Sequence, residues 1–294
     1  MVGEPERHVV TTVVALLLGA AVGALAWRSL QPTFAHPALQ RENHRGAAIA
    51  TAGGLVLVVA AVALEGTARL VEVVAADLGH EPIPSATRVP RLMVLVAVLG
   101  LGALGLVDDL VGTGESGGFK GHLGALARGR LTTGALKLFG GAAVCLVAVS
   151  LDIVAAPGRF LADAALVALA ANLGNLFDRA PGRVGKVSVV CFVVLAIATG
   201  FDPRLAGTAV VVGAGVAVLL PDLRERVMLG DVGANVLGAA LGLGVVVACG
   251  PVVRTVVLLL LVALNLASEA VSFSAVIGRV PPLRAADRLG RPRA

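Results

Sequence analysis

The chain has 294 residues, of which 57% are hydrophobic and 15% are charged, and its formal net charge is +5. Soluble globular domains are about 45–50% apolar, so this composition excludes an ordinary soluble domain and predicts an integral membrane protein. The loops are poor in aromatic residues, which gives no indication of nucleic-acid binding. Their positive charge instead favours anionic lipids or phosphates as partners.

Apolar stretches long enough to cross the hydrocarbon core, which takes about 20 helical residues, recur along the whole chain. Lipid offers backbone amides no hydrogen-bond partners, so these stretches are expected to be helices. We therefore predict an all-α transmembrane helix bundle of about nine spans. In chain order the predicted spans are Val9–Trp27, Ala47–Leu64, Leu92–Val107, Thr133–Leu151, Phe160–Leu176, Val187–Thr199, Leu205–Leu220, Val232–Ala248 and Val252–Phe273.

Lysine and arginine residues are distributed unevenly between the two sets of connecting segments. If the odd-numbered spans run inward, most of these residues fall in cytoplasmic segments, as the positive-inside rule requires. The N-terminus is then outside and the C-terminus is cytoplasmic. A signal peptide over the first span is the alternative, but its leading segment MVGEPER is net acidic, which is atypical of signal peptides.

The chain is expected to form one membrane domain over residues 1–294. The outer segment 65–91 is predicted to be a short amphipathic surface helix followed by a proline-bounded linker. Residues 108–132 form the main cytoplasmic loop, which is glycine-rich, and residues 274–294 form a cytoplasmic tail. The three cysteines, Cys145, Cys191 and Cys249, lack CxxC spacing and are interpreted as small core residues without a disulfide or metal role.

Acidic and amide residues gather at span ends on the cytoplasmic side. Each alone is compatible with helix capping, and an acid such as Asp231 gains from a helix N-terminus. Ionisable residues near the hydrocarbon are costly, however, and together they tend to mark function. The group comprises Asp108 and Asp109 in GLVDDLVG, Asn172, Asn175 and Asp178 in NLGNLFDRAPG, Asp231 in MLGDVGANVLG, and Asn265 and Glu269 in the last span.

Carboxylates and amide oxygens without a histidine or cysteine set favour Mg²⁺, which keeps several waters and shares its coordination with substrate phosphates. Basic residues on the same side of the membrane could bind phosphate, although each could equally be a topology signal. Acids and bases together at one interface predict phosphoryl transfer rather than ion conduction. These basic residues are Arg45, Lys120, His122, Lys137, Arg179 and Arg183.

The three motifs, in this order and at helix ends, resemble the G-x-x-D-D, N-x-x-N-L-x-D and M-G-D-x-G-S elements of the polyprenyl-phosphate sugar-1-phosphate transferases. This superfamily includes the bacterial phospho-N-acetylmuramoyl-pentapeptide transferase and the N-acetylhexosamine-1-phosphate transferases. The resemblance implies Mg²⁺-dependent transfer of a sugar 1-phosphate from a UDP-sugar to a polyprenyl phosphate, with release of UMP. It also implies a multi-pass protein of the plasma membrane, with a cytoplasmic active face, that acts in cell-envelope glycan synthesis such as that of peptidoglycan.

The resemblance implies a role for each motif residue. Asp231 matches the metal-binding aspartate, Asp108 and Asp109 match the pair near the lipid phosphate, and Lys137 matches a lysine on the helix that follows this pair. A phosphate monoester has a second pKa near 6, so the acceptor is already largely dianionic at pH 7. Direct attack on the donor is therefore favoured over a covalent phospho-aspartate. The expected substrate-binding residues are Arg45, Lys120, His122, Asn172, Asn175, Asp178 and Arg179.

The chain also departs from the family pattern. Its last inner segment, GRVPPLRAADRLGRPRA, lacks the histidines of the pentapeptide branch, and Arg179 and Pro181 stand where known members continue with Gly and a second Asp. These differences predict a simple UDP-N-acetylhexosamine, or a related UDP-sugar, as donor. A lipid-phosphate-binding relative without turnover, a cation-coupled transporter and a homodimer remain open alternatives.

Overall fold

The computed structural model describes residues 4–42, 46, 48–80, 85–111, 133–152 and 156–292. Two short strands, β1 (Gln40–Glu42) and β2 (Ala48–Ala50), pair antiparallel with Gln40 opposite Ala50. The 3-10 helices are η1 (Pro37–Leu39), η2 (Ser85–Thr87) and η3 (Pro203–Leu205). The α-helices are α1 (Glu4–Ser29), α2 (Gln31–Phe34), α3 (Leu55–Asp77), α4 (Arg88–Val111), α6 (Thr133–Ser150), α7 (Pro157–Phe177), α8 (Arg183–Ala198), α9 (Ala206–Leu223), α10 (Gly230–Ala248), α11 (Pro251–Ala270), α12 (Phe273–Arg279) and α13 (Pro281–Arg288).

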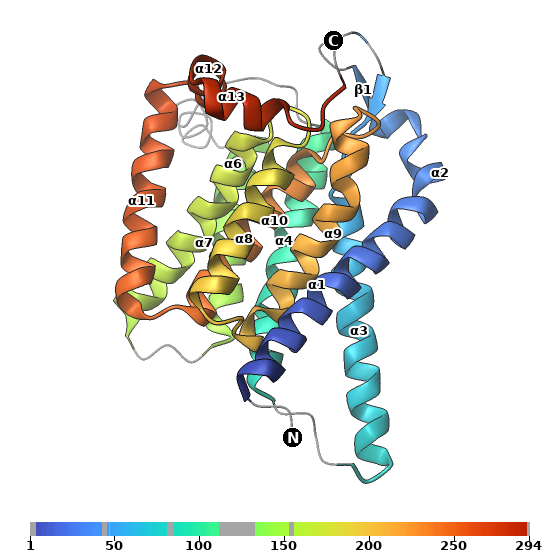
Figure 1. Cartoon of the computed structure of the whole chain (residues 1–294), viewed down its shortest axis with the longest axis vertical. Helices are drawn as coiled ribbons and strands as arrows, with labels where there is room; N and C mark the ends of the chain where they lie inside the picture. The colour runs from blue at the N-terminus through green and yellow to red at the C-terminus, as the bar shows by residue number, and fades with distance from the viewer. Residues whose placement is uncertain are drawn as a thin grey trace.

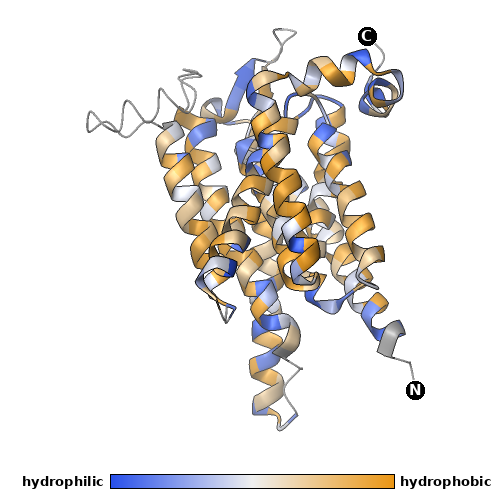
Figure 2. Ribbon diagram, turned by 90° about the vertical axis from the view of Figure 1, so that its left-hand side faces the viewer, coloured by the Kyte–Doolittle hydropathy of each residue, from blue (hydrophilic) through white to orange (hydrophobic). Residues whose placement is uncertain are grey.

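The described helices form a bundle of the kind found in membranes (Figure 1). Among the described residues, six segments are long and apolar enough to cross a bilayer, namely α1, α4, α7, α10, α11 and η3 together with α9. Figure 2 shows hydrophobic residues along the sides of the bundle and hydrophilic residues concentrated toward its ends. This distribution is the one expected of a protein whose flanks face lipid.

Helix α10 is the centre of the bundle. Almost all of its residues are buried, and it packs against α4, α7, α8 and α9. Small residues allow the close approach that interhelical packing in membranes favours: a Cβ at Gly238 would lie 2.8 Å from the Cα of Ala171 on α7. The position of α10 therefore fixes that of its first turn, which carries Asp231.

The second predicted span ends at Leu64, whereas α3 continues without a break to Asp77. Glu65, which marks the end of the predicted span, is 8% exposed and accepts a hydrogen bond from Arg91 Nε at 2.8 Å. Arg91 also contacts Glu72 at 3.1 Å, and Arg88 contacts Glu72 at 2.6 Å. The residues predicted to form a separate short surface helix are therefore the second half of α3, and the acids of this half are paired with the start of α4.

Candidate functional site

The paired acids of α4 have different surroundings, although they are adjacent in sequence. Asp109 accepts hydrogen bonds from the backbone N–H groups of Asp231 at 3.1 Å and Val232 at 3.3 Å. These donors belong to the first turn of α10, where a carboxylate satisfies unpaired N–H groups and the helix dipole favours negative charge. Asp109 therefore attaches the end of α4 to the start of α10.

Gly230 makes this attachment sterically feasible. Its φ is +71°, a conformation that glycine adopts more readily than other residues. A Cβ at this position would lie 2.6 Å from Asp109 Oδ2 and 3.0 Å from the backbone nitrogen of Ala52. The glycine that precedes Asp231 is thus required both by the turn and by the close approach of α4.

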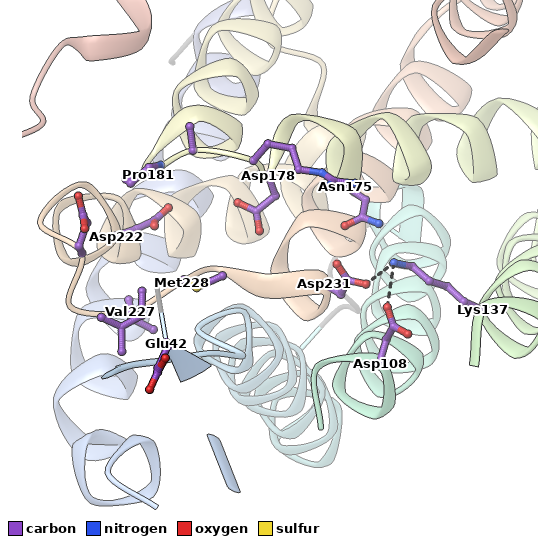
Figure 3. A pocket seen from close by; sticks show the side chains of 14 residues that line it. Glu42, Asp108, Lys137, Asn175, Asp178, Pro181, Asp222, Val227, Met228 and Asp231 are labelled. Carbon is purple, nitrogen blue, oxygen red and sulfur yellow. Dashed lines mark hydrogen bonds and ion pairs between the residues drawn. The ribbon is translucent and has the colours of Figure 1, made fainter. Parts of the chain in front are cut away.

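Whereas Asp109 bonds to α10, Asp108 is directed toward Lys137 on α6. Lys137 Nζ lies 3.6 Å from Asp108 Oδ2 and makes a short ion pair with Asp231 Oδ2 (Figure 3). Asn175 on α7 completes the group: with its amide oriented to satisfy both partners, its nitrogen donates to Asp231 Oδ1 at 2.5 Å and its oxygen accepts from Lys137 Nζ at 2.6 Å. Four helices thus contribute one polar side chain each to a single cluster.

The cluster opens into a cavity of about 560 Å³ at the same end of the bundle. Four further acids and one arginine contribute to a lining that is rich in charge (Figure 3). Carboxylates and cations that converge in this way can bind a metal–phosphate group or a polar ligand. The lining residues are Glu42, Ile49, Asp108, Lys137, Asn175, Asp178, Arg179, Ala180, Pro181, Asp222, Glu225, Val227, Met228 and Asp231.

Asp178 occupies the C-cap of α7, directly after the apolar helix ends. Burial raises the pKa of its carboxyl group well above the ordinary value, and the nearby carboxylates of Asp222, Asp231 and Asp109 raise it further. A group of this kind gains from a cation that enters the cavity, because the cation offsets the repulsion between the acids.

Asp222 was not singled out by the sequence, yet it is 5% exposed and lines the cavity. Its Oδ2 accepts a hydrogen bond from Gly182 N at 3.0 Å, which attaches the segment after Asp178 to the end of α9. Glu42, at the end of β1, was missed in the same way. The only sequence signal for Asp222 is a lone acid after Pro221 at the end of an apolar run.

Strand β2, which pairs with the strand that carries Glu42, and the residues that follow it pack against the residues preceding Asp231. Met228 N donates to Ala50 O at 2.7 Å, and Gly54 N donates to Leu229 O at 2.9 Å. Arg41 donates to the backbone carbonyls of Asp109 at 3.0 Å and Leu110 at 2.9 Å, at the end of α4 where such carbonyls lack helical partners. The segment between α2 and α3 therefore contacts both helices that supply the acids.

The remaining predicted residues divide into two groups. Asn172 lies away from the cavity lining and donates to Asn265 Oδ1 at 2.6 Å, and Asn265 in turn donates to Leu169 O at 3.2 Å. These contacts join α7 to α11, so the structure gives Asn172 an interhelical role rather than a place in the cavity. Arg45, Lys120 and His122 lie outside the described residues.

Within the described part of the chain, no three His, Cys, Asp or Glu side chains are grouped in a way that could hold a metal ion. A comparison with models of known protein families finds no match, and a comparison with curated proteins finds no relative. The geometry itself presents a polar cavity with paired acids, a lysine and an amide at the end of a membrane bundle. Its carboxylates are suited to bind a cation, and its lysine and arginine are suited to bind a phosphate group.

Proposed function

We propose that this protein is a membrane phosphoglycosyl transferase that moves a sugar 1-phosphate from a UDP-sugar to a polyprenyl phosphate and releases UMP. The observation that carries the proposal is the convergence of Asp108, Lys137 and Asp231 beside the cavity. These residues come from well-separated parts of the sequence, and the motifs that contain or precede them are the ones that resemble the transferase superfamily. Their spatial convergence supports the proposal independently of the sequence pattern.

Magnesium fits the chemistry of the donor set. Mg²⁺ is commonly held by one or two carboxylates, with waters and substrate phosphates completing its coordination, so a cluster of three protein ligands is not required. Asp231 and Asp108 would hold the ion, and Asn175 offers a further oxygen once Lys137 moves toward a substrate phosphate. The ion would supply positive charge that neutralises the diphosphate.

The residues of the chain have the following roles in the proposed reaction. An oxygen of the lipid phosphate attacks the sugar-linked β-phosphorus of the donor, and the bond from this phosphorus to the bridging oxygen breaks, so that UMP leaves with the electron pair. Lys137 and Arg179 hold phosphate oxygens whose negative charge redistributes during transfer. Asp109 acts through α10 and is a positioning residue.

The proposed topology has nine spans and a cytoplasmic site in the plasma membrane. Helices α3, α6 and α8 supply the three spans beyond the six apolar segments. An odd number of spans requires the termini to lie on opposite sides, and Figure 1 shows them at opposite ends of the bundle. The basic residues of the inner segments support the cytoplasmic assignment of the end that carries the site.

The test is a transfer assay with the purified full chain, polyprenyl phosphate, Mg²⁺ and a panel of UDP-sugars, in which UMP release is measured. We expect activity with a UDP-N-acetylhexosamine in preference to the UDP-muramoyl-pentapeptide. Asp231→Asn should reduce the rate by at least about 10³-fold, while Asp202→Asn, in an ion pair with Arg204 outside the site, should retain it. Lipid-phosphate binding without UMP release from any donor would instead identify a non-catalytic relative.

A further inference from the structure

The C-terminal helices α12 and α13 lie across the end of the bundle that carries the cavity (Figure 1), and α13 is fastened to the start of α8. Arg183, the first residue of α8, is 6% exposed. Its Nε and one terminal nitrogen donate to the two carboxylate oxygens of Asp287 at 2.7 and 3.1 Å, and the other terminal nitrogen donates to Ser274 Oγ at 2.8 Å. A bidentate arginine–carboxylate pair of this kind fixes orientation as well as distance.

Lys186, one turn further along α8, binds the end of α13. Its Nζ donates to the backbone carbonyls of Ala286 at 2.9 Å, Asp287 at 2.6 Å and Leu289 at 3.1 Å. The last carbonyls of a helix have no partners within it, and a lysine has three N–H donors to offer. Lys186 therefore caps α13 and uses all of its donors to do so.

Arg291 extends the same network to the wall of the cavity. Its Nε donates to the backbone carbonyl of Pro181 at 2.9 Å, and a terminal nitrogen donates to Asp287 at 2.7 Å. Asp178, Arg179, Ala180 and Pro181, called the wall segment below, line the cavity. The next residue, Gly182, is held from the other side by Asp222, so the wall segment is fixed between α9 and the tail.

A second contact joins the two regions. The rings of Phe177, which directly precedes the wall segment, and Phe273, the first residue of α12, stack with centroids 5.5 Å apart. Burial by itself would raise the pKa of the Asp287 carboxyl, but the hydrogen bond and charge of Arg183, together with Arg291 and Lys186, hold it below its ordinary value. Asp287 thus remains charged throughout the physiological pH range.

We propose that α12, α13 and Arg291 form a clamp that holds the wall segment in its binding position, with Asp287 as the central positioning residue. Asp287 receives guanidinium contacts from Arg183 and Arg291. The Arg291 side chain also donates to Pro181 of the wall segment, whereas Arg183 contacts that segment through its backbone N–H, which donates to Ala180 O at 3.1 Å. Removal of the carboxylate leaves the buried Arg183 without its charge partner, which is strongly unfavourable. Arg291 also loses the carboxylate that orients its guanidinium group, so its contact with Pro181 is weakened.

The first experiment needs no substrate. A cysteine is placed at Ala180 in a variant whose native cysteines are replaced by alanine, and its rate of reaction with a water-soluble maleimide is measured. Asp287→Asn and Arg291→Gln are each expected to raise this rate at least about fivefold. Arg288→Gln is the matched control, because Arg288 is an exposed residue on the same helix. Equal rates in all four proteins would overturn the clamp.

The second experiment rests on the proposed function. Residues that bind donor equally in the ground and transition states affect KM rather than kcat. Asp287→Asn should therefore raise the KM for the UDP-sugar about tenfold and keep kcat within about threefold. A purely structural defect would instead lower the apparent kcat at an unchanged KM, and that result would reject the clamp. Arg291→Gln gives the same test with the Arg183–Asp287 pair intact. If the unmodified protein releases no UMP, the maleimide rates still decide whether the clamp exists.

Discussion

Lys137 occupies, in this structure, the place between two carboxylates where a bound cation would be stabilised. Its ammonium group contacts Asp231 and lies 3.6 Å from Asp108. The lysine thus lowers the repulsion that Asp108 and Asp231 would otherwise experience in an apolar surrounding. A divalent ion that binds the same oxygens has to displace it, so the lysine and the metal compete for these acids.

Lys137→Met is therefore expected to increase the affinity for Mn²⁺, used as a probe for Mg²⁺, by at least about tenfold, equivalent to about 1.4 kcal/mol. The same change should abolish transfer, because the cation that binds substrate phosphate is lost. Calorimetric titration of the purified protein with Mn²⁺ measures the affinity, and Lys137→Arg serves as the charge-retaining control. An affinity that is unchanged or lower in Lys137→Met would show that the two cations do not compete.

Asp178→Asn should stabilise the protein in a pH-dependent way. Because burial and neighbouring acids raise the pKa of Asp178 in the folded state, its neutral form is tolerated at low pH and its ionisation becomes costly as the pH rises through the folded pKa. The melting temperature of Asp178→Asn should match that of the unmodified protein near pH 4 and exceed it near pH 8. A difference that is independent of pH would contradict this assignment, and a weaker donor affinity should accompany the gain in stability.

At the scale of elements, the end of α4 and the start of α10 act as one unit joined by Asp109. Asp109→Ala should lower the free energy of unfolding by ~1 kcal/mol, as loss of a helix cap does. Asp108→Ala is the matched control: its carboxylate is 27% exposed and points to Lys137, so we expect a change below ~0.5 kcal/mol together with a large loss of activity. Chemical unfolding in detergent measures both. Equal destabilisation by the two variants would remove the distinction between the positioning and the catalytic acid.

The apolar helices could be predicted from composition. Hydrocarbon offers the backbone N–H and C=O groups no hydrogen-bond partners, and in a helix these groups bond to one another. The extent of α3 could not be predicted from the sequence, because Glu65 indicates the end of a span as long as its partner Arg91 is not known. The same difficulty conceals the clamp: Arg183 and Asp287 are far apart in sequence and pair only after the bundle has formed. Asn172 fits a site motif, yet the structure gives it a partner on α11.

At the scale of the whole molecule, the cluster follows from where the helices end. Helices α4 and α7 end, and α6 and α10 begin, at the level of the cavity, so Asp108, Lys137, Asn175 and Asp231 meet there. The order of the predicted spans was sufficient to predict that these residues gather at one end of the bundle. It could not indicate Asp222 or Glu42. Asp222 contributes because the end of α9 is bonded to Gly182 after the wall segment, and Glu42 contributes because β1 pairs with β2, which itself pairs with Val227 before α10.

The proposed orientation can be tested without reference to catalysis. Single cysteines replace His80, which follows α3, or Ala285 on α13, in a variant whose native cysteines are replaced by alanine. Both positions are exposed in the structure. In intact cells a membrane-impermeant maleimide should label the cysteine at position 80 and leave the one at position 285 unlabelled until the membrane is opened. The reason is that nine spans place the two positions on opposite sides, with the basic segments inside. Labelling of both positions in intact cells would show that an even number of spans separates them. Labelling of position 285 alone would show the inverted topology, with the acidic cluster on the outer face, where a cytoplasmic donor cannot reach it.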